Sequence, residues 1–100
     1  MPIRSAPFDF TSLMIALAPE ERGVYALWQN GELIYVGTAL GRSLTLRSRL
    51  IDHFSGLEGP CTQRATHYGW EACSRPGERE LEFLEEYRSQ FRRFPRCNRI

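Results

Sequence analysis

A predicted β-hairpin between Gly23 and Gly37 constrains the fold of this chain more than any other stretch. Two runs rich in β-forming residues flank Asn30-Gly31, a dipeptide that tolerates the positive φ angles of a type I′ turn and so joins antiparallel strands. Because the turn sets the register, Tyr25 and Tyr35 are predicted on neighbouring strands. Gly23 opens the first strand and Gly37 follows the second tyrosine, and at both glycines the backbone can bend or be closely approached.

The two strands also carry a pair of related tripeptides, Gly23-Val24-Tyr25 and Tyr35-Val36-Gly37. This pairing resembles the GIY-YIG nuclease superfamily, in which valine commonly replaces the isoleucine of each tripeptide. The resemblance implies an α+β fold of the sandwich-like GIY-YIG type, with a small three-stranded antiparallel sheet flanked by helices. The resemblance extends from Gly23 to Asn98, and these residues form the predicted core of the chain.

The rest of the chain supplies the helices and the third strand. Turn residues and apolar periodicity predict helices over 11–17, 45–54 and 78–93 and a strand over 65–73, with Asp9 or Thr11 and then Thr45 as helix N-caps. Residues 55–64 are predicted as a loop. This order predicts one domain over 1–100, in which 1–22 form an N-terminal arm and a short helix and 23–98 form the core.

Composition predicts a cytoplasmic protein that does not cross a membrane. No apolar run approaches the roughly 20 residues that span a bilayer, and residues 1–6 lack the long apolar region of a secretory signal. Cys61, Cys73 and Cys97 form an odd, widely spaced set, so reduced thiols are expected rather than disulfides. A zinc site that joins His67 to Cys61 and Cys73 is disfavoured, because the spacing fits no usual ligand pattern.

The charge of the chain gives divided evidence on nucleic-acid binding. The formal net charge is only +1, whereas nucleic-acid-binding domains usually carry a basic excess. All 13 basic residues are arginines, and a guanidinium suits bidentate phosphate contact. The base composition of the genome is nevertheless the preferred explanation for an all-arginine chain.

The predicted helix over 78–93 directs one acid toward the core. Its apolar face is formed by Phe83, Leu84, Tyr87 and Phe91, with Phe94 just beyond. At about 100° per residue, Glu80 falls in the middle of that face. A carboxylate placed there is costly unless it is paired or binds a metal, although the N-terminal end of the helix dipole offers a purely structural alternative. In the resembling family one glutamate on this helix holds the divalent metal, which implies Glu80 and leaves Glu82, disfavoured by the helical phase, as the alternative.

The predicted helix over 45–54 matches a second family pattern, an arginine followed four residues later by His-Phe. The pattern implies Arg49 as the group that stabilises the transition state, because a fixed guanidinium can bind the charged phosphate oxygens. His53 is then a substrate or proton-transfer contact, or else a structural histidine. The loop 40–44 is longer than expected, so Arg47 or Arg42 remains an alternative to Arg49, and Arg47 is expected to bind substrate together with Gly37.

A Pro-x-x-Asn ending, Pro95 to Asn98, completes the resemblance. Asn98 is expected to bond backbone groups and, with Gly23, to serve the architecture of the site rather than its chemistry.

The resemblance implies a divalent-metal-dependent endonuclease, a phosphodiester hydrolase that acts on DNA in repair, recombination or a mobile element. Glu80 is expected to hold Mg²⁺ or Mn²⁺, Tyr25 to act as general base on the attacking water or to orient it, and Tyr35 to position water or phosphate. Since 100 residues leave no room for a second DNA-binding domain, a homodimer or a partner protein is expected to supply specificity, on DNA that includes branched or damaged forms. The alternatives are a non-catalytic nucleic-acid-binding module and a protein-interaction domain on the same scaffold.

Overall fold

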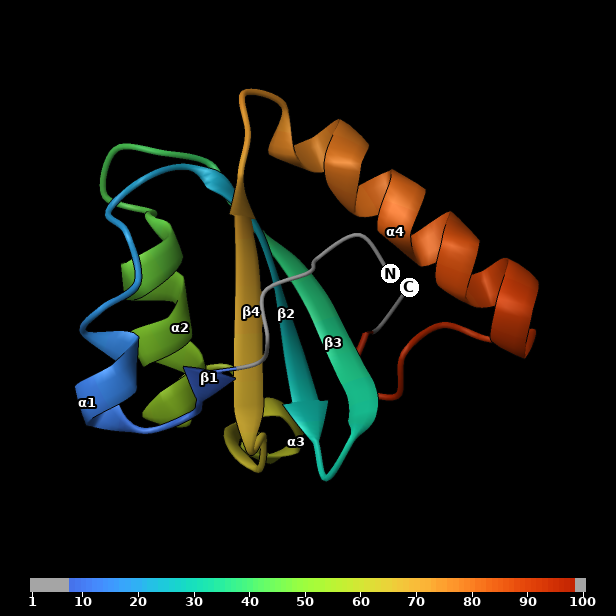
Figure 1. Cartoon of the computed structure of the whole chain (residues 1–100), viewed down its shortest axis with the longest axis horizontal. Coiled ribbons are helices and arrows are strands. Elements are labelled where there is room, and N and C mark those ends of the chain that lie inside the picture. The colour runs from blue at the N-terminus through green and yellow to red at the C-terminus, as the bar shows by residue number, and fades with distance from the viewer. Residues whose placement is uncertain (1–7, 99–100) are drawn as a thin grey trace.

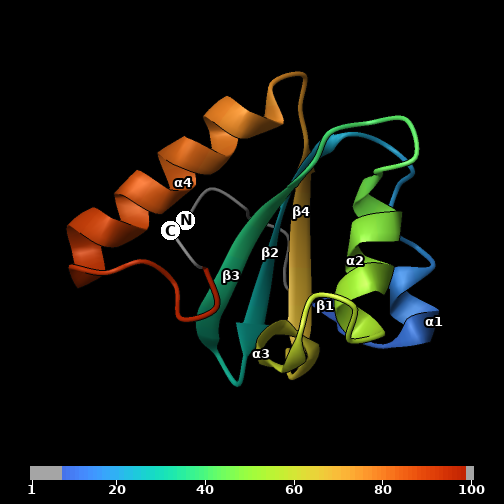
Figure 2. The same ribbon diagram turned by 180° about the vertical axis from the view of Figure 1, so that it is seen from behind.

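A four-stranded antiparallel sheet lies between two layers of helix in the computed structural model, which describes residues 8–98 (Figure 1). The strands are β1 (Phe8–Asp9), β2 (Gly23–Gln29), β3 (Glu32–Ala39) and β4 (His67–Ala72), in the spatial order β1-β4-β2-β3. Helix α4 (Pro76–Phe91) covers one face, and α1 (Ser12–Ile15) and α2 (Leu46–Phe54) cover the other (Figure 2). A short helix, α3 (Pro60–Gln63), lies near the hairpin end of the sheet.

The predicted hairpin is confirmed, including its turn. Asn30 and Gly31 have φ angles of 50° and 87°, as a type I′ turn requires. Tyr25 lies opposite Gly37, and Tyr35 lies opposite Leu27. The two tyrosine rings therefore share one face of the sheet, with their centroids 6.0 Å apart.

The expected sheet of three strands is wrong, because a fourth strand is added at its edge. Phe8 and Asp9 of β1 pair with Tyr68 and His67 of β4. Two residues are too few to show the period of two by which a strand is recognised in sequence. The rest of the predicted N-terminal arm, residues 1–7, lies outside the described residues.

The helices begin where their capping residues predict. Thr11 accepts a hydrogen bond from the Met14 amide, and Thr45 and Ser48 form a reciprocal capping box, which satisfies amides that a helix start leaves unpaired. Helix α4 begins at Pro76, two residues before its predicted start, since proline suits the first helical position. Part of the predicted loop 55–64 is helical, namely α3.

Each face of the sheet packs its own apolar core. On the α1 and α2 side, Leu46 and Leu50 pack with Tyr25 and Leu27, and on the other side a second core joins α4 to the sheet. The α4 core contains Val24, Ala26, Leu33, Val36, Phe83, Leu84 and Tyr87. These layers hold α2 and α4 on opposite sides of β3.

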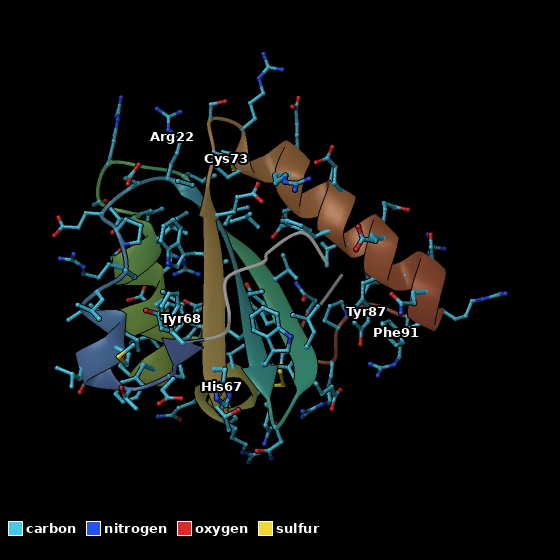
Figure 3. The ribbon with its side chains drawn as sticks, in the orientation of Figure 1. Arg22, His67, Tyr68, Cys73, Tyr87 and Phe91 are labelled. Atoms are coloured by element: carbon cyan, nitrogen blue, oxygen red, sulfur yellow. A yellow bond between two sulfur atoms is a disulfide. The ribbon has the colours of Figure 1, made fainter. Side chains whose placement is uncertain are left out.

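One predicted core residue of α4 is exposed. Phe91 keeps 48% of its surface accessible, although its ring stacks on that of Tyr87 at 4.5 Å between centroids (Figure 3). Helix α4 extends beyond the sheet at this end (Figure 1), so the last turn has less sheet to pack against than the first three.

The expectation of three reduced thiols is wrong as well. Cys61 of α3 forms a disulfide with Cys97, with 5.8 Å between their Cα atoms, and Cys73 is free. Cys61 and Cys97 lie 36 residues apart in sequence, so only the folded chain shows that they meet. Disulfides are rare in reducing compartments, so this pair does not support the expected cytoplasmic location. Among residues 8–98, no helix has the length and apolar character needed to cross a membrane.

Candidate active site

A cavity of about 580 Å³ opens beside the edge strand β3 and collects residues that are distant in sequence. Tyr35 comes from β3, His53 from α2, and Glu80 from α4. The remaining lining residues are Glu58, Gly59, Pro60, Cys61, Thr62, Leu84, Cys97 and Asn98. The cavity thus joins elements from both faces of the sheet at the one edge where they can meet.

Gly37 allows the two tyrosines of the hairpin to approach this site. A Cβ atom on Gly37 would lie 2.6 Å from the Tyr25 hydroxyl and 2.6 Å from the Tyr35 ring, far inside van der Waals contact. Gly23 has the architectural place expected of it, because a Cβ atom there would lie 2.4 Å from the carbonyl oxygen of Glu71 on β4. Glycine at these two positions is therefore a requirement of packing.

A short chain of buried hydrogen bonds runs from Tyr25 to α3. The Tyr25 hydroxyl lies 2.7 Å from His53 Nε2, and His53 Nδ1 lies 2.7 Å from the Thr62 hydroxyl. His53 is only 1% exposed and Thr62 only 3%. The imidazole ring also lies close to Tyr35, with 4.9 Å between ring centroids, so His53 contacts both tyrosines of the hairpin.

Burial sets the protonation state of these groups. Burial raises the pKa of Tyr25 and the neighbouring Tyr35 adds to that shift, whereas the Arg49 guanidinium opposes it. Burial likewise raises the pKa of Tyr35, with Arg49 opposing and Glu80 adding. Burial, aided by Arg49, lowers the pKa of His53 to about 4. At neutral pH both phenols therefore carry their protons, and His53 is a neutral imidazole.

Arg49 is the arginine of α2 that interacts electrostatically with the two tyrosines. Its Nη1 donates to Asp52 at 2.9 Å and lies 3.5 Å from a carboxylate oxygen of Glu58, and its side chain is 18% exposed. Because its positive charge opposes the rise in the pKa of both Tyr25 and Tyr35, the guanidinium lies within electrostatic reach of both phenols.

The two alternative arginines lie elsewhere. Arg47 donates to the carbonyl oxygen of Ala18 and pairs with Glu20, so it connects α2 to the segment after α1. Arg42 lines a separate recess with Arg22 and Cys73, and both of those residues lie at the far end of the sheet from the hairpin turn (Figure 3). The structure therefore brings Arg49, and neither alternative, to the tyrosines.

Glu80 is a half-buried carboxylate that faces the cavity. Burial raises its pKa, and within residues 8–98 it has no hydrogen bond or ion pair. Glu82, by contrast, is exposed and bonded to Arg79. No group of three or more His, Cys, Asp or Glu side chains in the described chain could hold a metal, so a cation bound by Glu80 would take most of its other ligands from water.

Two further expectations concern residues beside the cavity. Asn98 confirms its predicted bonding, because its side-chain oxygen accepts from the Val36 amide at 3.0 Å and its amide nitrogen donates to the Val36 carbonyl at 2.9 Å. The disfavoured zinc set does not form, since Cys61 is in the disulfide and His67 bonds Thr66 and pairs with Asp9.

Sequence reasoning missed three contributors to the cavity, namely Glu58, Thr62 and the Cys61–Cys97 pair. All three depend on where the segment 55–63 packs, and that segment has no apolar periodicity. Its one local signal is Gly59-Pro60, because proline is common at the first position of a helix.

The fold matches solved structures of one domain. The GIY-YIG N-terminal endonuclease domain of UvrC from Thermotoga maritima, bound to its catalytic divalent cation magnesium, is 26% identical, with a TM-score of 0.62 over 85% of this chain and 91% of that one. Two point mutants of that domain, also bound to the catalytic divalent cation, are 23% and 22% identical, with TM-scores of 0.55 and 0.56 over 85% and 86% of this chain and 91% of theirs.

No protein-family model matches the sequence, and no curated protein does. In this chain the two tripeptides of the hairpin lie on β2 and β3, and the fold that contains them is the one shared with that GIY-YIG domain. The chain is therefore a GIY-YIG domain.

Proposed function

We propose that this domain is a divalent-metal-dependent endonuclease that hydrolyses phosphodiester bonds of DNA. The observation that carries the proposal is Glu80, a half-buried carboxylate that lines one cavity with Tyr35 and His53 and lacks a partner within residues 8–98. A carboxylate in that state fits a cation. The similar Thermotoga maritima structure is an endonuclease domain bound to magnesium, which supports the same conclusion.

Glu80 would hold Mg²⁺ or Mn²⁺, because both cations prefer oxygen ligands and readily keep several waters. Of the two carboxylates that line the cavity, Glu58 is paired with Arg49, and Glu80 with the open space beside it fits such a partly hydrated ion. When bound, the cation supplies positive charge that stabilises the transition state of phosphodiester hydrolysis.

Arg49, Tyr25 and Tyr35 would have separate roles in the hydrolysis. Arg49 would bind the phosphate and stabilise its developing charge, which requires that it exchange the weaker of its two carboxylate contacts, Glu58 at 3.5 Å, for the substrate. Tyr25 would orient the attacking water or, once its own proton has been lost to solvent, accept the proton of that water, and Tyr35 would position the water or the phosphate.

His53 and Gly37 would both determine the position of the Tyr25 side chain. His53 holds the Tyr25 hydroxyl at 2.7 Å, and Gly37, without a side chain, leaves room for the two tyrosine side chains to converge beside the substrate. Because both phenols are protonated in the free protein, Tyr25 can serve as a base only once positive charge is added beside it, from Arg49 and from the cation. Arg47, bonded to Ala18 and Glu20, stays a predicted substrate contact outside this group.

The test is cleavage of plasmid and branched DNA by the purified protein in Mn²⁺. We expect cleavage, and we expect Glu80→Ala and Tyr25→Phe to abolish it while the circular dichroism spectrum is unchanged. Glu82→Ala is the matched control, since it removes an exposed carboxylate from the same helix and leaves cleavage intact. Cleavage that survives Glu80→Ala would show that the site is wrongly assigned.

A second class of function, a non-catalytic nucleic-acid-binding module, is supported by the basic residues, since all 13 are arginines, whose guanidinium groups suit phosphate contact. Binding of DNA or RNA without cleavage of either would support that module. The nuclease proposal includes a homodimer or a partner protein that supplies specificity. Sedimentation with and without branched DNA measures whether the homodimer forms.

A further inference from the structure

Thr62 of α3 has no part in the chemistry described above, yet its hydroxyl is buried against the site. Apart from tyrosines, the buried polar side chains of residues 8–98 are His53 and Thr62, at 1% and 3% exposure. They contact each other, with 2.7 Å between His53 Nδ1 and Thr62 Oγ1. A buried polar group is costly unless it is hydrogen-bonded, so the direction of this bond matters.

The direction follows from counting protons. Within residues 8–98, the Thr62 hydroxyl has no hydrogen bond besides the one to His53. If Nδ1 carried the imidazole proton and donated it, the Thr62 hydroxyl would accept, and its own proton would have no acceptor. If the hydroxyl donates to Nδ1 instead, every proton of the pair is used.

The second arrangement also fixes the other side of the ring. A neutral imidazole carries one proton, and His53 is neutral because burial lowers its pKa to about 4. With Nδ1 as acceptor that proton lies on Nε2, which is 2.7 Å from the Tyr25 oxygen. His53 therefore donates to the Tyr25 oxygen, and the phenolic proton of Tyr25 is left for the Tyr35 hydroxyl, with which Tyr25 also forms a hydrogen bond.

We propose that Thr62 is a positioning residue, whose hydroxyl fixes His53 in the tautomer that presents Nε2–H to the Tyr25 oxygen. A donor held on that oxygen stabilises the negative charge that develops when Tyr25 gives up its proton. The meaning of this donor for catalysis rests on the proposed nuclease function, whereas the tautomer itself does not.

The placement of α3 supports this role. Helix α3 follows Gly59, whose φ angle of 99° favours glycine, and it begins at Pro60. The residue next to Thr62, Cys61, is bonded to Cys97 in the turn after α4. The Thr62 hydroxyl is thus carried on a short helix that is anchored at both its start and its middle.

The test is ¹⁵N NMR of the metal-free protein labelled at histidine. The chain has only two histidines, and His67, whose Nδ1 lies 2.9 Å from the Thr66 hydroxyl, is an internal reference. At pH 7 we expect His53 to be protonated at Nε2, with the Nδ1 resonance shifted as hydrogen bonding requires. A proton on Nδ1 would overturn the inference without the need for any variant.

Thr62→Val keeps the shape of the side chain and removes its hydroxyl, and Thr62→Ser keeps the hydroxyl. We expect Thr62→Val to move the His53 Nδ1 resonance to that of a free nitrogen, and Thr62→Ser to restore the wild-type value. Thr66→Val is the matched control, which perturbs His67 and leaves His53 unchanged. Unchanged His53 resonances in Thr62→Val would also overturn the inference.

In DNA cleavage with Mn²⁺, Thr62→Val should lower kcat about tenfold with little change in KM, as expected for a lost buried hydrogen bond, and Thr62→Ser should recover most of that loss. Equal kcat values for Thr62→Val and the wild type would refute a positioning role. If the wild type cleaves no nucleic acid, the proposed function fails, and the NMR measurement still decides the tautomer.

Discussion

At the scale of single residues, the site depends on Gly37, which has no Cβ atom. The rings of Tyr25 and Tyr35 meet over Gly37, where any Cβ atom would lie 2.6 Å from both side chains. The tripeptide pattern of the hairpin therefore has a steric origin, since the second glycine makes space for two aromatic rings on one face.

Gly37→Ala is expected to lower the free energy of unfolding by about 1–3 kcal/mol, the usual cost of forcing atoms into a filled core. It should also abolish DNA cleavage, because the two rings must move apart. Urea denaturation followed by tryptophan fluorescence measures the first effect.

Gly77→Ala is the matched control. A Cβ atom at Gly77, in the first turn of α4, would meet no atom within 4 Å, and alanine favours helix by roughly 0.5–1 kcal/mol over glycine. If Gly37→Ala were as stable as Gly77→Ala, the close packing described at Gly37 would be refuted.

At the scale of elements, β2, α2 and α3 meet at one neutral side chain. His53 of α2 bonds Tyr25 of β2 and Thr62 of α3. Protonation of the imidazole would place a buried charge between these three elements. Both of its hydrogen-bond partners are uncharged hydroxyls, and Glu58 and Asp52 offset only part of the cost that burial and Arg49 impose.

This contact predicts a pH dependence of stability. The pKa of His53 is about 4 in the folded protein and about 6.5 in an unfolded chain, so between these values the unfolded state binds the proton more readily. Stability is therefore fully present above pH of about 6.5 and is lost as pH falls toward about 4, by up to about 3 kcal/mol. Urea denaturation across that range should show a steeper loss for the wild type than for His53→Gln, and equal slopes would contradict the prediction.

The elements that sequence predicts well are those whose signals are local. The hairpin turn needs only Asn30-Gly31, and the starts of α1 and α2 need only Thr11 and Thr45. Strand β1 and helix α3 escape prediction, since two and four residues are too short to display a hydrophobic period and are held by contacts with distant segments.

The candidate site divides along the same line. Glu80 is found by helical phase, because a carboxylate in an apolar stripe is a conflict within one element. Thr62 and Glu58 show no such conflict in the sequence. Thr62 contacts His53, and Glu58 contacts Arg49, only after the segment that contains α3 has packed against α2. The preference for Arg49 over Arg47 came from the His53-Phe54 that follows Arg49 in the family pattern. Helical phase does not supply it, because both arginines lie on flanks of the same helix.

At the scale of the whole molecule, the Cys61–Cys97 disulfide closes a large covalent loop. The two cysteines are 36 residues apart in sequence, and the loop contains β4 and α4. In the chain-entropy description of cross-links, a loop of this size stabilises the folded state by about 4 kcal/mol, because it restricts the unfolded chain.

Reduction of the protein with dithiothreitol is therefore expected to lower its free energy of unfolding by an amount of that order, and Cys61→Ser should do the same without reductant. Cys73→Ser, which alters a free thiol, is the matched control and should change stability little. Reduced and oxidised protein with the same urea midpoint would contradict the prediction.

The segment that follows α4 has one more effect. Strand β3 is an edge strand, and edges with free amide and carbonyl groups invite pairing with strands of other molecules. Here the Cys97 amide donates to Ile34, and the Asn98 side chain occupies both backbone groups of Val36. The asparagine imitates the backbone of a neighbouring strand and occupies the place where one would add, so the same residue that shapes the cavity also protects the open side of the sheet from edge-to-edge aggregation.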